Sequence, residues 1–177
     1  YDYLYSDNSV FTWAPYQLIY DTPDKGIKGR AAAEDLVKTR IRGELLSAEK
    51  EILVISPYFV PMKSAIQAYV DTQQRGIDVT IVTNSLAANN QSTVHGGYAP
   101  SRKPLLAGGV KIYEIRADAK VAGSQIVAAS GSTATLHTKA FAVDRKDLFI
   151  GSFNFDPRSA DLNSEMGVII KHPGMAE

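Results

Sequence analysis

Stretches rich in apolar residues alternate with stretches of helical periodicity along this chain. Apolar residues recur at helical spacing over about residues 31–49, and further helices are predicted at about 63–75 and 99–107. Short apolar runs, typical of buried parallel strands, stand before, between and after these helices: Gln17–Tyr20, Ile52–Ile55, Val79–Val82 and Val110–Ile115. The alternation of strand and helix predicts an α/β domain with right-handed crossovers.

The C-terminal part follows a different pattern. Thr135–Val143 is expected to be a strand, the polar residues Asp144–Asp147 a turn, and Leu148–Gly151 the returning strand of a hairpin. Met166–Ile170 completes the sheet, whereas residues 117–132, rich in Ala, Gly and Ser, are expected to form a flexible connection. We therefore expect an α/β fold with a mainly parallel, mixed sheet that is flanked by helices on both faces.

The composition is that of one compact domain. With 177 residues, of which 45% are hydrophobic, the chain can bury one sizeable core, so residues 1–177 are expected to form a single domain. The absence of cysteine rules out disulfides and thiolate metal sites. Nineteen basic residues balance nineteen acidic ones. Because nucleic-acid-binding proteins usually carry a basic excess, this balance disfavours DNA or RNA as a partner.

One motif carries most of the functional information. Six residues follow the pattern H-x-K-x4-D-x6-G-S-x-N: His137, Lys139, Asp144, Gly151, Ser152 and Asn154. At ordinary residue frequencies such a pattern arises by chance on the order of once per ten million positions. A histidine and a lysine on an ordinary strand would explain the first pair alone, but not all six positions.

The spacing of the motif suits a phosphoryl group. Alternate side chains of a strand share a face, so His137 and Lys139 are expected to project together. An imidazole that acts as nucleophile or acid–base, beside a fixed ammonium group, matches the chemistry of a phosphate ester. The returning strand brings back the Ser152 hydroxyl and the Asn154 amide, which can both donate to phosphate oxygens. These side chains are therefore expected to converge on one open pocket.

The motif resembles the HKD motif of the phospholipase D superfamily, whose members form a phosphohistidine intermediate and need no metal. Flanking segments are similar to those of bacterial cardiolipin synthases, most closely the type called cardiolipin synthase C: Ser56–Pro61, Thr83–Asn89, Val94–Pro100 and Asn154–Gly167. The resemblance runs from about Trp13 to Gly174. It implies a phospholipase D-like catalytic domain without metal or cofactor.

Family enzymes of this kind carry two such motifs, and this chain has one. His95 and His172 are each followed at the second position by glycine in place of lysine, so neither begins another copy. The chain is therefore expected to be the C-terminal half of a longer enzyme, with an upstream HKD half as its partner. In such a pair one histidine attacks phosphorus while the other protonates the leaving oxygen. The resemblance implies that His137 is the general acid–base and the upstream histidine the nucleophile.

Two acidic residues have different expected roles. The resemblance implies that Glu165 hydrogen-bonds Nδ1 of a catalytic histidine and fixes its tautomer, so we expect it near the His137 ring. Asp144 is counted with the catalytic set as a motif residue, but at the turn it should face away from the phosphate and serve the structure. The expected catalytic residues are thus His137, Lys139, Asp144 and Glu165, and the expected substrate-binding residues are Lys139, Ser152 and Asn154.

Three functional classes remain open. The flanking segments favour phosphatidyl transfer or phosphodiester hydrolysis on a phosphatidylglycerol-like phospholipid, which implies peripheral contact with the cytoplasmic side of a bacterial inner membrane. The alternative is a homodimeric phosphodiesterase or nuclease, because some single-motif relatives assemble one site from two identical chains. The chain on its own could also be a catalytically silent module. Turnover of phosphatidylglycerol and of single-stranded DNA, with particle size measured in parallel, separates these classes.

Overall fold

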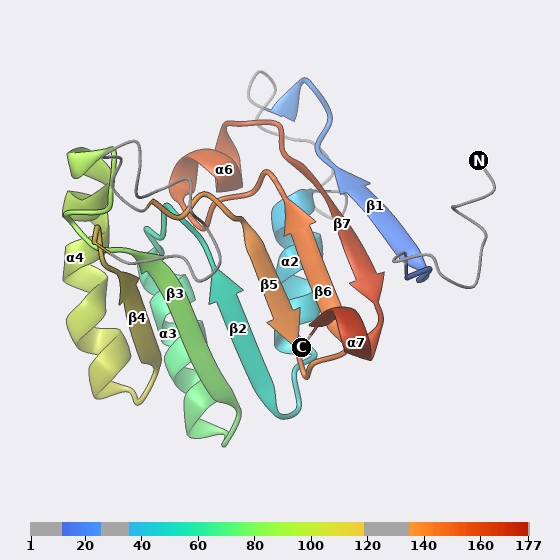
Figure 1. Cartoon of the computed structure of the whole chain (residues 1–177), viewed down its shortest axis with the longest axis horizontal. Helices are drawn as coiled ribbons and strands as arrows, with labels where there is room; N and C mark the ends of the chain where they lie inside the picture. The colour runs from blue at the N-terminus through green and yellow to red at the C-terminus, as the bar shows by residue number, and fades with distance from the viewer. Residues whose placement is uncertain (1–11, 26–35, 119–134, 177) are drawn as a thin grey trace.

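The computed structural model describes residues 12–25, 36–118 and 135–176. Within these ranges the chain forms one seven-stranded sheet with the strand order β1-β7-β6-β5-β2-β3-β4 (Figure 1). The strands are β1 (Tyr16–Tyr20), β2 (Glu51–Ile55), β3 (Asp78–Asn84), β4 (Lys111–Ile115), β5 (Ala140–Val143), β6 (Asp147–Gly151) and β7 (Met166–Lys171).

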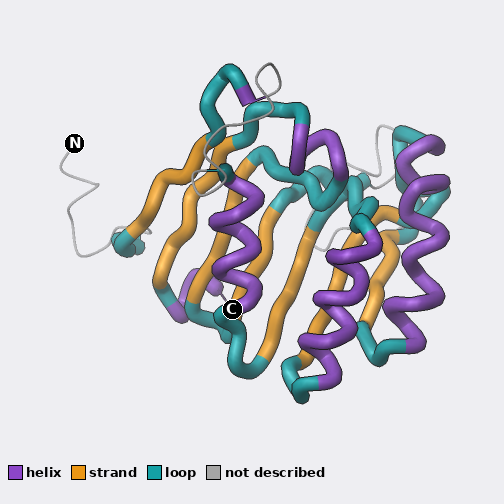
Figure 2. Tube along the Cα trace, turned by 180° about the vertical axis from the view of Figure 1, so that it is seen from behind, coloured by secondary structure: helices purple, strands orange, loops and turns teal. Residues whose placement is uncertain are grey.

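Three long helices cover one face of this sheet, as the view from behind shows (Figure 2). They are α2 (Val37–Leu46), α3 (Lys63–Gln74) and α4 (Ser92–Ala107). The short α6 (Pro157–Asp161) lies at one edge of the sheet, and its start is specified locally, because Asp156 accepts a 2.8 Å hydrogen bond from Ser159 N and proline occupies the first helical position. On the opposite face the described helix is the four-residue α7 (Pro173–Ala176).

The sheet has a parallel and an antiparallel part. β2, β3 and β4 are parallel and are joined through α3 and α4, whereas β5, β6, β7 and β1 pair antiparallel, and β5 joins the two parts by pairing antiparallel with β2. The predicted α/β class and the mixed sheet are confirmed. Parallel pairing is restricted to three strands, because β5, β6 and β7 follow one another as antiparallel neighbours in the sheet.

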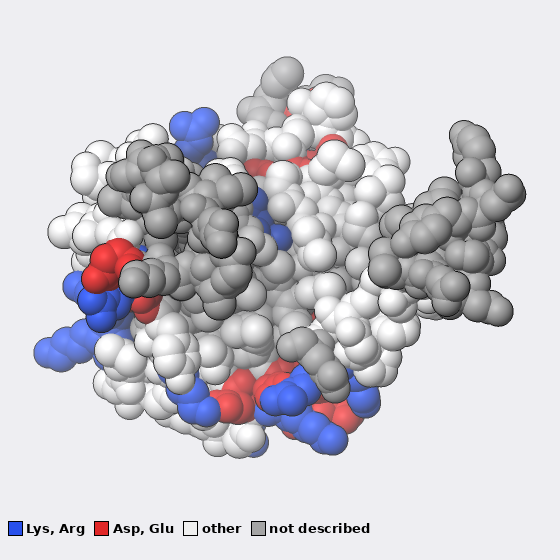
Figure 3. All heavy atoms as spheres, viewed as in Figure 1, with Lys and Arg blue, Asp and Glu red and all other residues white. Residues whose placement is uncertain are grey.

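The core lies between the sheet and the long helices. Strand residues on this face alternate with residues on the open face, and the buried ones include Val54, Ile81, Phe141, Phe149 and Ile169. The Phe141 and Phe149 rings are stacked with their centroids 5.0 Å apart. The open face is largely uncharged in Figure 3 and exposes large apolar side chains, including Tyr16, Leu18, Tyr20, Ile150 and Met166.

Helix α4 begins earlier than its sequence pattern predicts. The predicted helix starts at about residue 99, but α4 starts at Ser92 and includes both Pro100 and Pro104. Tertiary packing outweighs the local helix-breaking signals here, since a Cβ on Gly97 would lie 2.9 Å from Val60 Cγ1, so the glycine allows close approach. His95, which the predicted boundaries leave in a loop, is therefore a buried residue of the first part of this helix.

Some predicted features lie outside the described residues. These are the first part of the helix predicted at 31–49 and most of the connection predicted at 117–132. None of the helices in the described ranges is both long and apolar enough to cross a bilayer.

Candidate active site

The motif residues other than Asp144 gather at one edge of the sheet, where β2, β3 and β6 end and β5 and β7 begin (Figure 1). The prediction that the whole of Thr135–Val143 is a strand is wrong in its first part. The ladder begins at Ala140, which pairs with the last residue of β2, Ile55. His137 and Lys139 thus stand in the segment that leads into β5, beyond the end of its neighbour.

The two side chains nevertheless lie together. Lys139 Nζ is 3.4 Å from His137 Nε2 and donates a 3.0 Å hydrogen bond to the His137 carbonyl. Partial burial lowers the pKa of Lys139, against the opposing effect of the nearby Glu165 and Asp156 carboxylates. His137 itself is exposed, so its imidazole is open to a ligand.

Glycine at position 151 has a packing reason. Gly151 N donates a 3.1 Å hydrogen bond to Lys139 O, and Gly151 is paired in register with Gly167 of β7. A Cβ on Gly151 would lie 2.7 Å from the Phe149 ring and 2.8 Å from the Gly167 Cα. The glycine lets the ends of β6 and β7 approach each other, which brings the residues that follow β6 up to the start of β7.

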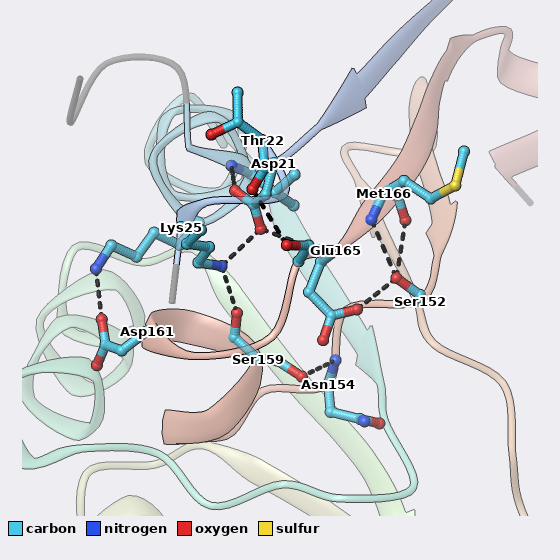
Figure 4. A network of polar contacts seen from close by, with 12 residues as sticks. Asp21, Thr22, Lys25, Ser152, Asn154, Ser159, Asp161, Glu165 and Met166 are labelled. Atoms are coloured by element: carbon cyan, nitrogen blue, oxygen red, sulfur yellow. Dashed lines mark hydrogen bonds and ion pairs between the residues drawn. The ribbon is translucent and has the colours of Figure 1, made fainter. Parts of the chain in front are cut away.

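The Ser152 hydroxyl is already engaged within the chain. It donates to the Glu165 carboxylate and accepts a 3.0 Å hydrogen bond from Met166 N (Figure 4). Asn154 donates through its backbone N–H to Ser159 Oγ at 3.2 Å, and its buried side-chain Oδ1 has no hydrogen-bond partner. The Ser152 hydroxyl is thus engaged within the chain, whereas the Oδ1 acceptor of Asn154 is buried without a partner.

A buried network of polar contacts holds the backbone of Glu165, and the sequence analysis did not predict it (Figure 4). Asp21 N donates to Glu165 O at 2.8 Å, and Glu165 N donates to Asp21 Oδ2 at 3.0 Å. The same carboxylate forms a 2.6 Å ion pair with Lys25, and these side chains are 0% and 3% exposed. Lys25 also donates to Ser159 O at 2.8 Å, which ties α6 to the network.

Asp21 also caps a helix from a distance. Val37, the first residue of α2, donates its backbone N–H to Asp21 Oδ1 at 2.9 Å, whereas the helix's own N-cap residue, Leu36, has no side-chain oxygen to offer. The Asp-Thr-Pro-Asp pattern predicts a loop. The only signal of an ion pair in the sequence is the i,i+4 spacing of Asp21 and Lys25. Their burial depends on tertiary contacts that local sequence does not encode.

The expected contact between Glu165 and the His137 ring does not form in the described part of the chain. Glu165 is buried, and its carboxylate has Ser152 as its hydrogen-bond partner, while the imidazole has Lys139 beside it. Glu165 therefore lies at the same edge of the sheet as His137, but the two side chains are not hydrogen-bonded to each other.

Asp144 lies at the other end of the β5–β6 hairpin. Its carboxylate accepts hydrogen bonds of 2.8–2.9 Å from three consecutive backbone N–H groups, those of Glu49, Lys50 and Glu51. Burial alone would raise the pKa of Asp144, but these hydrogen bonds outweigh it and lower the pKa. In this position Asp144 stabilises the backbone at the start of β2, at the opposite end of the hairpin from His137.

A groove of about 400 Å³ lies between α2 and α3, with Ile41, Tyr69, Phe153, Phe155 and Asp156 among its lining residues. His137, Lys139, Ser152 and Asn154 do not line it. The motif side chains thus occupy an open edge of the sheet instead of this groove. Within the described residues no three His, Asp or Glu side chains are grouped so that they could hold a metal ion.

The chain is similar to known proteins in sequence and in fold. A family model described as "Cardiolipin synthase, PLD-like domain" matches residues 41–177. Cardiolipin synthase C of Escherichia coli K12 is 41% identical over 169 residues, which cover 93% of this chain and 35% of that protein. The chain spans about a third or less of the length of the curated relatives it matches.

Two solved structures show the same fold at low sequence identity. Nuc from Salmonella typhimurium, a phospholipase D family member, matches with a TM-score of 0.61 and 21% identity over 93% of this chain and 88% of that one. Phosphatidylserine synthase from Haemophilus influenzae matches with a TM-score of 0.63 and 15% identity over 93% of this chain and 36% of that one.

Proposed function

Because the chain belongs to the phospholipase D superfamily, through its match to the phospholipase D-like domain of cardiolipin synthases, we propose that it carries half of a site for phosphodiester cleavage and phosphatidyl transfer. The observation that supports this most is the exposed His137 imidazole with Lys139 Nζ 3.4 Å from its Nε2, at an open edge of the sheet. The whole chain, residues 1–177, would form one catalytic domain, the C-terminal motif-bearing half of a longer enzyme.

The reaction needs a second histidine, which an upstream half would supply. That histidine attacks phosphorus and forms a P–N bond, while the P–O bond to the leaving group breaks and His137 protonates the departing oxygen. His137 then removes a proton from water or an alcohol, whose oxygen attacks phosphorus and releases the histidine. Each proton that His137 gives in the first step is recovered in the second.

Charge on the phosphoryl oxygens needs compensation in both steps. Lys139 would supply it as a fixed ammonium group, and burial that lowers its pKa also places the charge in a less polar setting, where it acts more strongly. The Asn154 side chain would add a hydrogen bond by donating from its Nδ2, since its unpaired Oδ1 can only accept. Ser152 would contribute mainly by holding Glu165, since its hydroxyl already donates to that carboxylate.

Glu165 would orient a histidine from the other half. Its backbone is fixed by Asp21, and its side chain does not bond His137 within this chain. A carboxylate held rigidly at the site edge is suited to accept from the Nδ1 of an imidazole that arrives with the partner half. His137, Lys139 and Glu165 are thus the proposed catalytic residues, and Asp144 is assigned to the fold.

The proposed substrate is a phosphatidylglycerol-like phospholipid, whose phosphatidyl group would pass to a lipid hydroxyl. The support is the 41% identity to cardiolipin synthase C, which favours a lipid over a nucleic acid, as does the balance of 19 basic and 19 acidic residues. A lipid substrate places the enzyme at a membrane surface, and we propose peripheral attachment on the cytoplasmic side of a bacterial inner membrane.

A second candidate is a homodimer in which two copies of His137 face one phosphodiester. It is favoured by one observation, that the chain covers 88% of the Nuc structure, so a domain of this size forms a whole chain there. Such an assembly would need a two-fold axis at the motif edge.

The deciding experiment compares the chain alone with a protein that also contains the upstream half. We expect turnover of phosphatidylglycerol only when both halves are present, and the turnover should persist in EDTA, because Lys139 would supply the positive charge that a metal supplies elsewhere. Activity that is abolished by EDTA and restored by magnesium would reject this mechanism. Robust turnover by the chain alone, with light scattering showing that it is a dimer, would favour the homodimer.

A further inference from the structure

Asn84, the last residue of β3, is a buried amide that the chemistry above does not use. It is 1% exposed and stands at the sheet edge that carries His137. Its side chain reaches the segment before β5: Leu136 N donates to Asn84 Oδ1 at 2.9 Å, and Asn84 Nδ2 donates to Leu136 O at 3.0 Å. Both polar ends of the amide are thus satisfied by the backbone of the residue that precedes His137.

We propose that Asn84 is a positioning residue that sets the location of the His137 imidazole by holding the backbone of Leu136. The need for such a residue follows from the topology. β2, which lies between β3 and β5, ends at Ile55, so the N–H and C=O of Leu136 have no strand beside them. The Asn84 amide, which carries a donor and an acceptor like a peptide group, takes the place of the missing strand.

The ladder of β5 starts only at Ala140, and three other hydrogen bonds reach this segment in the described residues. Thr135 Oγ1 donates to Ala88 O at 3.1 Å, Lys139 Nζ to His137 O at 3.0 Å and Gly151 N to Lys139 O at 3.1 Å, and none of them binds the backbone of Leu136. His137 is exposed, so side-chain packing does not hold its ring tightly. The position of the imidazole therefore depends on the paired hydrogen bonds at Leu136.

No other side chain reproduces this pair at the same reach. Aspartate keeps the acceptor for Leu136 N–H but places a carboxylate against the Leu136 carbonyl, and glutamine is one methylene longer. Alanine leaves both backbone groups without partners. Because a catalytic group misplaced by about 1 Å can lose about 10²-fold in rate, the loss should appear in kcat more than in KM.

This inference rests on the proposed function, so the experiment has one readout that needs no activity. The variants are Asn84→Ala and Asn84→Asp in the protein with both motif-bearing halves, and the control is Val79→Ala, a buried core position in the same strand. Hydrogen exchange of the Leu136 amide is measured together with kcat, KM and thermal stability.

We expect Asn84→Ala to lower kcat on phosphatidylglycerol by about 10²-fold at temperatures well below its melting point, with KM nearly unchanged and faster exchange at Leu136. Asn84→Asp should also lower kcat and speed exchange at Leu136, because its carboxylate would face the Leu136 carbonyl in a buried site. Val79→Ala should lower the melting temperature and leave kcat and Leu136 exchange as in the parent protein.

Two results would overturn the inference. One is an unchanged exchange rate at Leu136 in both Asn84 variants. The other is a loss of kcat in the Asn84 variants that is no larger than in Val79→Ala at the same loss of stability. If the parent protein turns over no phosphodiester, the proposed function fails. The exchange rate at Leu136 and the NMR shift of the His137 ring then still decide whether Asn84 holds this segment.

Discussion

The two ends of the β5–β6 hairpin carry residues of one motif but are built differently. At one end His137 is exposed, and Lys139 is the side chain within hydrogen-bond distance of its ring in the described structure. At the other end Asp144 accepts three backbone N–H groups, and oppositely charged side chains gather along that edge (Figure 3). They form the ion pairs Arg145–Glu51, Lys111–Asp78 and Lys171–Asp147.

One end thus leaves polar groups available to a ligand, while the other satisfies them within the fold. The hairpin links the two, because its turn sets the register that returns Gly151 beside Lys139. The spacing between His137 and Asp144 therefore matches the length of β5, and the two ends of the hairpin can have different roles. Substitutions at the two ends should consequently affect different measurements.

The largest effect is expected for His137→Ala. Loss of the acid–base group should lower kcat of the two-half enzyme by about 10²–10⁴-fold. The melting temperature should change little, because the ring is exposed and surface changes are usually within about 0.5 kcal/mol. Kinetics on phosphatidylglycerol and calorimetry of the same sample check this. A large loss of stability with normal activity per folded molecule would remove the distinction between the two ends.

Lys139→Gln should follow, with about 10²–10³-fold lower kcat, as for the loss of one group that stabilises transition-state charge. Lys146→Gln is the matched control, because it removes an exposed lysine at the turn end of the same hairpin. Its activity should remain within a few-fold of the parent. Similar losses in both variants would mean that general attraction of an anionic lipid surface, and not a local contact, explains the effect.

Asp144→Ala should act on stability. Removal of a carboxylate that accepts three backbone N–H groups is expected to cost about 1.5–3 kcal/mol of unfolding free energy, with kcat of the folded protein nearly unchanged. Asp147→Ala, at the same turn, loses only a 3.8 Å ion pair with Lys171 and should cost about 0–1 kcal/mol. Urea unfolding measures both. Equal losses of unfolding free energy in the two variants would show that the three hydrogen bonds contribute no more than any negative charge at this turn.

The Asp144 contribution should also depend on pH. Its pKa is lower in the folded protein than the ordinary value of about 3.9, so the stabilisation is fully present above about pH 4 and is lost as pH falls through the folded pKa. The difference in stability between parent and Asp144→Ala should therefore be constant from pH 7 to about pH 5 and shrink below about pH 4. A difference that grows on acidification would contradict the assignment.

The contrast between the two ends of the β5–β6 hairpin also explains which features the sequence could predict. Periodicity and turn residues located β2, β3, β6 and β7 because each of these elements carries its own local pattern. The motif marked His137 and Lys139 because their chemistry depends on spacing. By contrast, Asp21, Lys25 and Asn84 owe their roles to partners 16 to 144 positions away in the chain. Such contacts leave no periodic signal.

Two errors in the predicted elements have the same origin. The predicted strand starts before His137, but the neighbouring strand β2 ends at Ile55 and is too short to pair with residues 135–139. The helix predicted at about 99–107 starts at Ser92 in the structure, where close contact with Val60 favours the small residue Gly97. In both cases a neighbour that is distant in sequence decides the local structure.

The smallest effect is expected at the turn itself, for Arg145→Gly. Asp144 and Arg145 both have φ of 53°, and Lys146 N donates to Val143 O at 3.0 Å, as in the two-residue turns that favour Asp-Gly. Glycine removes the left-handed strain of about 1–2 kcal/mol at this position. It also loses the ion pair of Arg145 with Glu51, which is mostly exposed and worth about 0–1 kcal/mol. In addition, it raises the entropy of the unfolded chain, which costs about 0.4–1 kcal/mol of stability.

These terms nearly cancel, so urea unfolding should show a change within about 1 kcal/mol of zero, and the activity at the His137 end should not change. A loss above that range would mean that the Arg145 side chain, and not the backbone of the turn, holds this end of the hairpin together.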